Sequence, residues 1–292
     1  MNKKVIAIVG PTGSGKTVWA KKIAKKFNAK IISADSRQIY KGLDIGTGKD
    51  KSFRQDLIDI ISPIQHFTVW DYQRLANDLI EQYLNMKSLP VLVGGTGLYL
   101  YAVLYGYVIP NLQEESLKLR EKLEKLKESE LYQKLQELDP KTAKTIDSKN
   151  KRRLIRALEV SILAQTPFSK LQKKKKPSFE TLIVGIETNR EALYSKVDAR
   201  IDQMIKDGLV EEVRELLKKY RPDLSTLNTI GYKEIIDYLQ GRIELKEAIA
   251  KIKTNTHAYI RRQETWFGKN KDIKWVREYE EAEKLIEKFL KK

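Results

Sequence analysis

A glycine-rich segment near the start of the chain has the spacing of a phosphate-binding loop. Its eight residues, Gly10-Pro11-Thr12-Gly13-Ser14-Gly15-Lys16-Thr17, match G-x-x-x-x-G-K-S/T at every position. The backbone N–H groups of such a loop converge on phosphate oxygens, and a helix that begins at its end adds positive potential. Lys16 would balance charge on the terminal phosphates, and the Thr17 hydroxyl would hold Mg²⁺. The motif predicts binding of a di- or triphosphate and leaves open whether that ligand is ATP.

The segments on either side of this loop have the pattern that the motif requires. Val5–Val9 is an apolar run that predicts a buried strand, and Thr17–Phe27 has apolar residues at helical spacing. A strand before the loop and a helix after it form the setting in which this motif binds phosphate. Residues 30–34 and 90–93 predict two more buried strands, with a helix predicted over 71–86 between them. Strands that alternate with helices indicate a parallel sheet.

Two polar side chains follow these strands where chemistry could take place. Asp35 follows the second predicted strand, and Thr96 lies in the glycine-rich turn after the third. Simple P-loop kinases also have an acid after a strand, so the loop and Asp35 together do not separate a kinase from other phosphate-binding enzymes. Thr96 could instead, or in addition, cap a helix over 97–105, and Thr68 is predicted as the N-cap of the helix over 71–86.

The pattern changes between residues 111 and 177. Leucines recur at helical spacing across 114–138 without any strand signal, and another helix is predicted over 151–165. The segment contains 18 Lys and Arg against 10 Asp and Glu, and it ends in the charged, hinge-like run Lys173–Lys176. We therefore predict a basic, all-helical insertion.

The predicted fold is α/β, a P-loop parallel-sheet core with helices on both faces, interrupted by this inserted all-helical domain. The core is predicted to comprise residues 1–110 and 178–292. A strand over 181–186 marks the return to the core, and a last strand is predicted at 273–276. The tail, 278–292, predicts an amphipathic helix that packs on the core.

Composition excludes several classes of site. The 292 residues include no cysteine and two histidines, so disulfides, cysteine zinc sites and thiol nucleophiles are excluded, and a cytoplasmic protein is expected. No run of 18 apolar residues occurs, which predicts no membrane span. The net charge of +17 favours a polyanionic partner, usually nucleic acid; a Lys-rich surface that serves solubility is the alternative.

Five segments, in this order along the chain, resemble the signature motifs of the tRNA dimethylallyltransferase family. The first two motifs together are highly specific for that family. The matching segments are Ile32–Lys49 (ISADSRQIYKGLDIGTGK), Val93–Tyr99 (VGGTGLY), Arg153–Glu159 (RLIRALE), Gly231–Glu234 (GYKE) and Arg261–Phe267 (RRQETWF). The resemblance extends from residue 5 to about 276, and without a C-terminal zinc finger the chain is similar to the bacterial type.

The resemblance implies a reaction and the residues that perform it. The donor is dimethylallyl diphosphate, and the acceptor is the N6 amine of the adenosine 3′ to the anticodon in tRNA. Asp35 resembles the carboxylate that takes the proton from this weakly nucleophilic amine. Thr96 resembles the threonine that touches the reacting groups, and Arg200 aligns with an arginine that reaches the diphosphate. The residues of the phosphate loop, Gly10 to Thr17, would bind the diphosphate, with Mg²⁺ as cofactor.

The same resemblance implies a tRNA surface on a monomeric enzyme. Asp35, Ser36, Arg37, Gln38 and Thr96 would hold a nucleotide flipped out of its stack. The insertion would lie against the phosphates of the anticodon stem, where contacts position RNA more than they read it. The remaining tRNA-binding residues are Arg120, Arg152, Arg153, Arg156, Tyr232 and Lys233.

Three other functions remain open at this point. They are a P-loop small-molecule kinase, a prenyltransferase that acts on free adenine nucleotides, and a non-enzymatic RNA-binding protein. Steady consumption of ATP would identify the kinase. The basic insertion favours tRNA over a mononucleotide, which needs no such surface.

Overall fold

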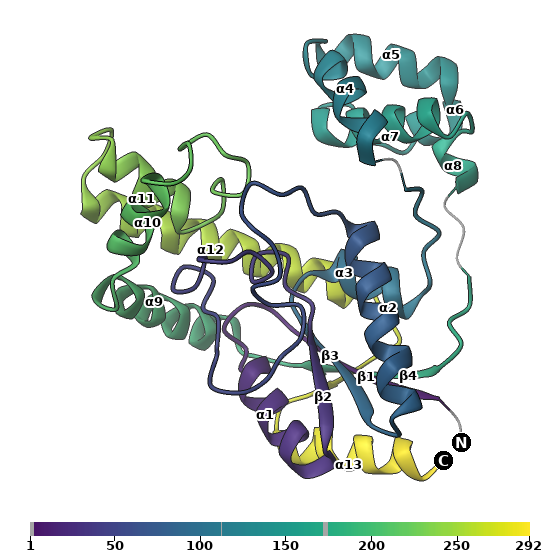
Figure 1. Cartoon of the computed structure of the whole chain (residues 1–292), viewed down its shortest axis with the longest axis vertical. Helices are drawn as coiled ribbons and strands as arrows, with labels where there is room; N and C mark the ends of the chain where they lie inside the picture. The colour runs from purple at the N-terminus through teal and green to yellow at the C-terminus, as the bar shows by residue number, and fades with distance from the viewer. Residues whose placement is uncertain (1–2, 112, 172–174) are drawn as a thin grey trace. The chain divides into compact units, whose positions relative to one another are not determined.

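A computed structural model describes residues 3–111, 113–171 and 175–292, with the side chains of 113–117 left out (Figure 1). Part of the predicted hinge at Lys173–Lys176, and the side chain of Leu117, therefore lie outside the described residues. Contacts divide the chain into two compact units, residues 1–100 with 178–292, and residues 101–177. The first of these units is called the core and the second the helical unit below.

The core is built on a five-stranded parallel sheet in the order β2-β3-β1-β4-β5. Its strands are β1 (Lys4–Val9), β2 (Ala29–Ser33), β3 (Leu89–Gly94), β4 (Glu180–Ile186) and β5 (Ile273–Val276). All five were predicted, with ends that differ by one residue at most. The apolar runs are continuous because both faces of the sheet are covered, which buries every residue of a central strand.

Helices cover both faces of this sheet. Trp19 and Ile23 of α1 (Lys16–Phe27) and Ile286 of α13 (Tyr279–Lys291) pack on one face with Ile6 and Ile8 of β1. Val5, Ala7 and Val9 of β1 and Ile32 of β2 are buried as well, and α2 (Val69–Asn85) packs on β2 and β3. This arrangement confirms the predicted fold class.

A second apolar cluster of the core lies beside the sheet. It joins residues 39–43 to four helices that follow β4 in the chain. These helices are α9 (Arg190–Lys206), α10 (Leu209–Leu217), α11 (Tyr232–Leu239) and α12 (Leu245–Gly268). The cluster anchors the segment after Asp35 to the C-terminal half of the chain.

The helical unit has its own apolar core, built on Leu131, Leu135, Leu154 and Leu158. Its helices are α4 (Gln113–Glu124), α5 (Glu128–Leu138), α6 (Pro140–Ala143), α7 (Lys151–Leu163) and α8 (Phe168–Leu171). The leucine pattern across 114–138 forms two helices rather than one. The backbone is extended at Lys127, and its N–H donates to the Glu130 carboxylate at 2.8 Å, which begins a new helix.

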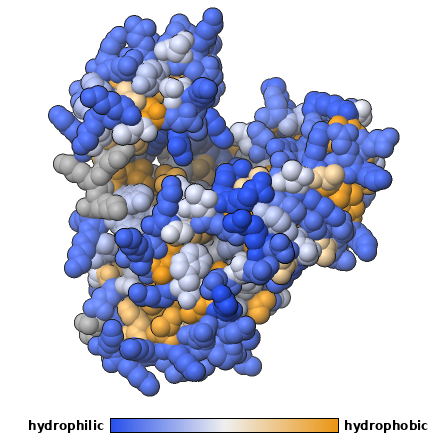
Figure 2. Space-filling model, turned by 180° about the vertical axis from the view of Figure 1, so that it is seen from behind, coloured by the Kyte–Doolittle hydropathy of each residue, from blue (hydrophilic) through white to orange (hydrophobic). Residues whose placement is uncertain are grey.

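Contacts place the edge of the helical unit at 100/101, within α3 (Gly97–Leu104), whereas the sequence predicted it at 110/111. Across residues 3–111, 113–171 and 175–292, no helix combines the length and the apolar character needed to cross a membrane. Figure 2 shows mostly hydrophilic residues on the face that it presents.

The predicted N-cap of α2 is confirmed and suggests a test of the helix. The Thr68 hydroxyl accepts the Asp71 N–H at 3.2 Å, and the Asp71 carboxylate accepts the Thr68 N–H at 2.8 Å. Replacing Thr68 by Ala should lower the free energy of unfolding by about 1 kcal/mol, since the helix loses a capping bond. Urea denaturation measures this change. Thr68→Ser keeps the hydroxyl, and an equal loss in that variant would contradict the assignment.

Candidate active site

The phosphate loop connects β1 to α1 and is shaped by its glycines. Gly13 and Gly15 have φ values of 85° and 94°, which side chains disfavour. A Cβ on Gly13 would also lie 2.5 Å from Val197 of α9, so the loop packs closely on that helix. The Lys16 ammonium donates to the carbonyl oxygens of Gly10 at 2.9 Å and Pro11 at 2.7 Å. The loop therefore curls around its lysine.

Three charged groups from distant parts of the chain act on one another at this loop. Burial lowers the pKa of Lys16 to about 8, with the Asp35 carboxylate raising it and the Arg200 guanidinium lowering it further. Burial also lowers the pKa of Arg200, again opposed by Asp35. The structure thus brings together the phosphate loop and two of the residues that the sequence predicted as catalytic.

The two cations have no ion-pair partner among the described residues, and Ser14 Oγ, also in the loop, is buried there without a hydrogen bond. Arg200 donates weakly to the Gly48 carbonyl at 3.4 Å. Partly desolvated cations and an unpaired buried hydroxyl are costly unless a ligand completes them. An anionic group with several oxygens, such as a diphosphate, complements this set.

Gly48 makes room for the arginine. A Cβ at this position would lie 1.4 Å from Arg200 Nη2, and the residue has a φ of 60°. The Gln38 amide donates to the Thr47 carbonyl at 3.1 Å in the same loop. One loop, residues 44–48, therefore holds both Arg200 and a residue predicted to bind the flipped nucleotide.

Asp35 and Thr96 meet at the carboxyl ends of β2 and β3. Asp35 Oδ1 accepts the N–H of Arg37 at 2.8 Å and of Gln38 at 3.4 Å, which closes a tight turn. The Ser36 N–H donates to Thr96 Oγ1 at 3.0 Å, and the Thr96 N–H donates to the Ala34 carbonyl at 3.1 Å. Thr96 also precedes α3, so it both begins a helix and faces the Asp35 turn.

Family models and known proteins match this chain over nearly its whole length. A model described as "IPP transferase" matches residues 38–271, and one described as "Isopentenyl transferase" matches residues 3–57. A tRNA dimethylallyltransferase of Thermoanaerobacter sp. (strain X514) is 42% identical over 307 residues, with 98% of this chain and 97% of the relative covered. A relative with the same name from Caldanaerobacter subterraneus subsp. tengcongensis is 42% identical over 301 residues, with 97% and 95% covered. The chain belongs to the tRNA dimethylallyltransferase family.

Solved structures of the family agree with this assignment. The tRNA delta(2)-isopentenylpyrophosphate transferase of Staphylococcus epidermidis has a TM-score of 0.72 and 33% identity, with 98% of this chain and 99% of that chain covered. A eukaryotic dimethylallyltransferase acting on tRNA has a TM-score of 0.80 and 26% identity, with 94% and 74% covered. The resemblance to the tRNA dimethylallyltransferase family that the sequence motifs indicated is therefore confirmed.

In this family member, the GYKE tyrosine that was predicted to bind tRNA is inside the core. Tyr232 is fully buried, and its hydroxyl donates to Glu212 Oε1 at 2.6 Å. The same carboxylate accepts the backbone N–H groups of Asp44, Ile45 and Gly46 at 3.2, 2.7 and 3.2 Å. Tyr232 therefore holds the carboxylate that fixes the 44–48 loop. The contact of Glu212 with residues 44–46 joins segments more than 160 residues apart, so the sequence motif carried no sign of it.

The basic residues predicted for tRNA binding differ in their surroundings. Arg120 and Arg156 both donate to Glu159 Oε2 at 2.9 Å, and Glu159 is fully buried. Arg152 and Arg153 are exposed on the first turn of α7. Lys233 is half-exposed, with its ammonium 3.6 Å from the Glu234 carboxylate. The helical unit thus uses two of its arginines internally and presents two to solvent.

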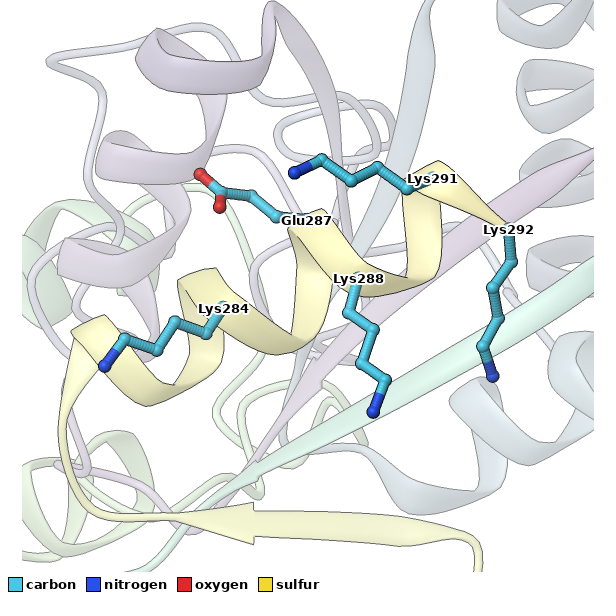
Figure 3. Close-up of a pocket in the computed structure, with 5 residues that line it drawn as sticks. All are labelled: Lys284, Glu287, Lys288, Lys291 and Lys292. Atoms are coloured by element: carbon cyan, nitrogen blue, oxygen red, sulfur yellow. The ribbon is translucent and has the colours of Figure 1, made fainter.

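A surface hollow lies elsewhere, against the last turns of α13 (Figure 3). Its lining consists of Lys284, Glu287, Lys288, Lys291 and Lys292. Glu287 is paired with Lys26 at 2.8 Å, and the lysines extend along the exposed side of the helix. No residue of the predicted site lines this hollow. Its lysines are exposed and do not surround a common point, so we do not assign a ligand to it.

The lowered pKa of Lys16 predicts how phosphate binding depends on pH. Below about pH 8 the lysine is protonated and complements an anion; above it the proton is lost and must be regained on binding. The affinity for inorganic diphosphate should fall as the pH rises through about 8, by up to about tenfold per pH unit. Calorimetric titrations measure this fall.

The ligand also titrates, so Lys16→Arg serves as the control. An arginine stays charged throughout this range, and the difference between the two curves isolates the lysine proton. Parallel curves for the wild type and Lys16→Arg would contradict a titrating lysine in the phosphate site.

Proposed function

We propose that this chain transfers a dimethylallyl group from dimethylallyl diphosphate to the N6 amine of the adenosine 3′ to the anticodon in tRNA and releases diphosphate. The observation that carries the proposal is the joint site of Lys16, Arg200 and Asp35 in a member of this family. Two unpaired cations fit a diphosphate, and a carboxylate at the same site fits the proton that the amine must lose. The reaction needs both functions in one place.

The diphosphate half of the site stabilises a leaving group. As the bond between the donor carbon and oxygen breaks, negative charge grows on the diphosphate. The loop N–H groups, the Lys16 ammonium and the Arg200 guanidinium are preorganised to bind that charge, which favours the transition state over the ground state. Two N–H groups of the loop have partners within the protein: that of Thr12 donates to Gln263 at 2.8 Å and that of Ser14 to the Pro11 carbonyl at 3.2 Å.

The acceptor half removes a proton. The N6 lone pair is delocalised into the purine ring, so the amine is a poor nucleophile until its N–H is polarised. The Asp35 carboxylate takes this proton as the new carbon–nitrogen bond forms. Oδ1 of Asp35 is held by the Arg37 and Gln38 N–H groups, which orients the carboxylate toward a base gripped by the same turn.

Magnesium fits this site through the phosphate loop. The described residues contain no group of three or more His, Cys, Asp or Glu that could hold a metal by themselves. Mg²⁺ typically takes one or two protein ligands, with phosphate oxygens and water as the rest. The Thr17 hydroxyl, at the start of α1, is the protein ligand that we propose. The ion would supply further charge stabilisation for the leaving diphosphate.

A transfer assay tests the function directly. Purified protein is offered radiolabelled dimethylallyl diphosphate with unmodified tRNA, AMP or ATP. Label should pass to tRNA and not to AMP, and ATP should not be consumed. Label on AMP would instead identify an enzyme for free nucleotides, and steady hydrolysis of ATP would identify a kinase-like activity.

Asp35→Asn tests the base within this assay. The asparagine Oδ1 still accepts the two turn N–H groups, but the amide takes no proton, so turnover should fall by roughly 10²–10⁴-fold. Affinity for tRNA should stay near that of the wild type, since the turn is preserved. A near-normal single-turnover rate in Asp35→Asn would remove the residue from the mechanism.

The helical unit, which we propose is the tRNA-binding insertion, supplies the phosphate contacts through its exposed arginines. Arg152 and Arg153 are free to meet a polyanion, whereas Arg120 and Arg156 neutralise the buried Glu159 carboxylate. A buried carboxylate without a paired cation lowers the stability of the fold. The main role of these two arginines is therefore to stabilise the helical unit. The four arginines predicted for tRNA binding therefore divide into two pairs.

This division predicts different outcomes for the two pairs. Replacing Arg152 and Arg153 together by Gln should weaken tRNA binding and reduce its salt slope by about one for each phosphate that is no longer neutralised. Arg156→Gln should lower the thermal stability instead. Lys284→Gln with Lys288→Gln, on α13, makes the same charge change as a control. An unchanged slope in the Arg152/Arg153 variant would mean that this turn does not face the RNA.

A further inference from the structure

One face of α12 follows the glycine-rich turn after β3. Tyr259, Gln263 and Trp266 are spaced i, i+4 and i+7, which places them on the same side of the helix. The Thr96 side chain lies close enough to the Tyr259 hydroxyl to lower its pKa, against the larger raising effect of burial. Gln263 reaches Gly95, and Trp266 lies against Gly97. Three side chains on one face of α12 therefore lie against residues 95, 96 and 97 of the turn.

Gln263 also reaches a second loop. Its Oε1 accepts the Thr12 N–H of the phosphate loop at 2.8 Å, and its Nε2 donates to the Gly95 carbonyl at 2.9 Å. The side chain is buried, with 5% of its area exposed. An amide has one end that accepts and one that donates, so a single orientation of this side chain satisfies both loops.

Gly95 and Gly97 leave the space that the side chains of Gln263 and Trp266 occupy. A Cβ on Gly95 would lie 2.3 Å from Gln263 Nε2, and a Cβ on Gly97 would lie 2.2 Å from Trp266 Nε1. Any larger residue would push α12 away from the turn. The close approach of α12 to the turn therefore depends on the glycines of the turn as well as on the side chains of the helix.

We infer that Gln263 is a positioning residue that sets the distance between the phosphate loop and the Thr96 turn, and so aligns the donor with the acceptor. The inference rests on the proposed transfer reaction. Its physical basis is that the donor is held at the end of β1, while Thr96 and Asp35 are held at the ends of β3 and β2. Gln263 ties the first of these loops to the second from a separate helix.

Alignment of this kind affects the rate more than binding. Bringing two bound reactants into line supplies a large part of a transfer rate, and a misplacement of about 1 Å can cost about 10²-fold. Gln263 bonds to backbone groups of the two loops, and in the proposed reaction it contacts no reacting atom. Its loss should lower kcat and leave the KM of each substrate within about threefold, because the groups that bind each substrate remain.

Two substitutions of different chemistry test this role in the full-length protein. Gln263→Met keeps the length of the side chain without either hydrogen bond, and its kcat should fall by about 10²-fold at every pH. Gln263→Glu as a carboxylate still accepts the Thr12 N–H but faces the Gly95 carbonyl with a second acceptor. A protonated glutamic acid restores the donor, so kcat should recover as the pH falls from about 9 to about 6, by up to about tenfold per pH unit.

Lys16 also changes its charge in this range, because burial lowers its pKa to about 8, so each kcat is divided by the wild-type value at the same pH. Gln240→Met, at the exposed end of α11, is the matched control for loss of an amide and should match the wild type. Circular dichroism and affinity for inorganic diphosphate confirm that each variant is folded.

The outcomes separate the inference from the function on which it rests. An inactive wild type would refute the proposed reaction, whatever the variants do. With an active wild type, a folded Gln263→Met that keeps its kcat would overturn the inference. So would a fall confined to KM, or a flat pH profile for Gln263→Glu relative to the wild type.

Discussion

The active site depends on two cations that have no ion-pair partner among the described residues. They lie near one carboxylate at the carboxyl ends of the parallel strands. Lys16 and Arg200 are partly desolvated, and Asp35 acts on both. Cations of this kind lower stability in the absence of an anion, and the fold tolerates them because the loops around them are fixed by other contacts. The carboxyl ends of parallel strands provide that position, since three loops meet there and leave the sheet in the same direction.

The supports of this charge come from the C-terminal half of the core. Glu212 fixes the 44–48 loop through three backbone N–H groups, and that loop in turn holds Gln38 and Arg200. Gln263 fixes the phosphate loop and the turn before Thr96 from α12. Residues that touch the substrates in the proposed reaction thus lie mostly before residue 100, while those that hold them in place follow residue 200. This explains why motifs with no obvious chemistry, such as GYKE and RRQETWF, accompany the phosphate loop.

The helical unit uses charge in a different way. Its buried Glu159 is paired with two arginines, and the pair with Arg120 joins α4 to α7. This adds to the apolar contacts of the unit, which are few in a domain of this size. The basic excess of this segment is therefore not all available to a nucleic acid. Counting charges along a sequence overestimates a binding surface whenever some cations neutralise buried carboxylates.

Local pattern determined the elements and the chemistry that depends on adjacent residues. The β1–loop–α1 unit, the five strands, the capping box of α2 and the Asp35 turn all follow from neighbours within a few positions, because strand, helix and turn preferences are local. Family motifs added the reaction and brought Thr96 and Arg200 into the predicted site. The leucine spacing continues across the break at Lys127, and the Glu130 cap that marks it is also local.

The tertiary structure alone decided which of these residues are exposed, paired or braced. It buried Tyr232 against Glu212, paired Arg120 and Arg156 with Glu159, and placed Gln263 between two loops. Tyr232 and Glu212 are 20 positions apart, Arg120 and Glu159 are 39 apart, and Gln263 and Thr12 are 251 apart, and no periodicity along the chain encodes that they meet. Of these contacts only the pair Arg156–Glu159 is local, at i,i+3 on one helix. Long-range partners are chosen by packing, since a buried polar group takes whichever complementary group the fold brings within hydrogen-bond reach.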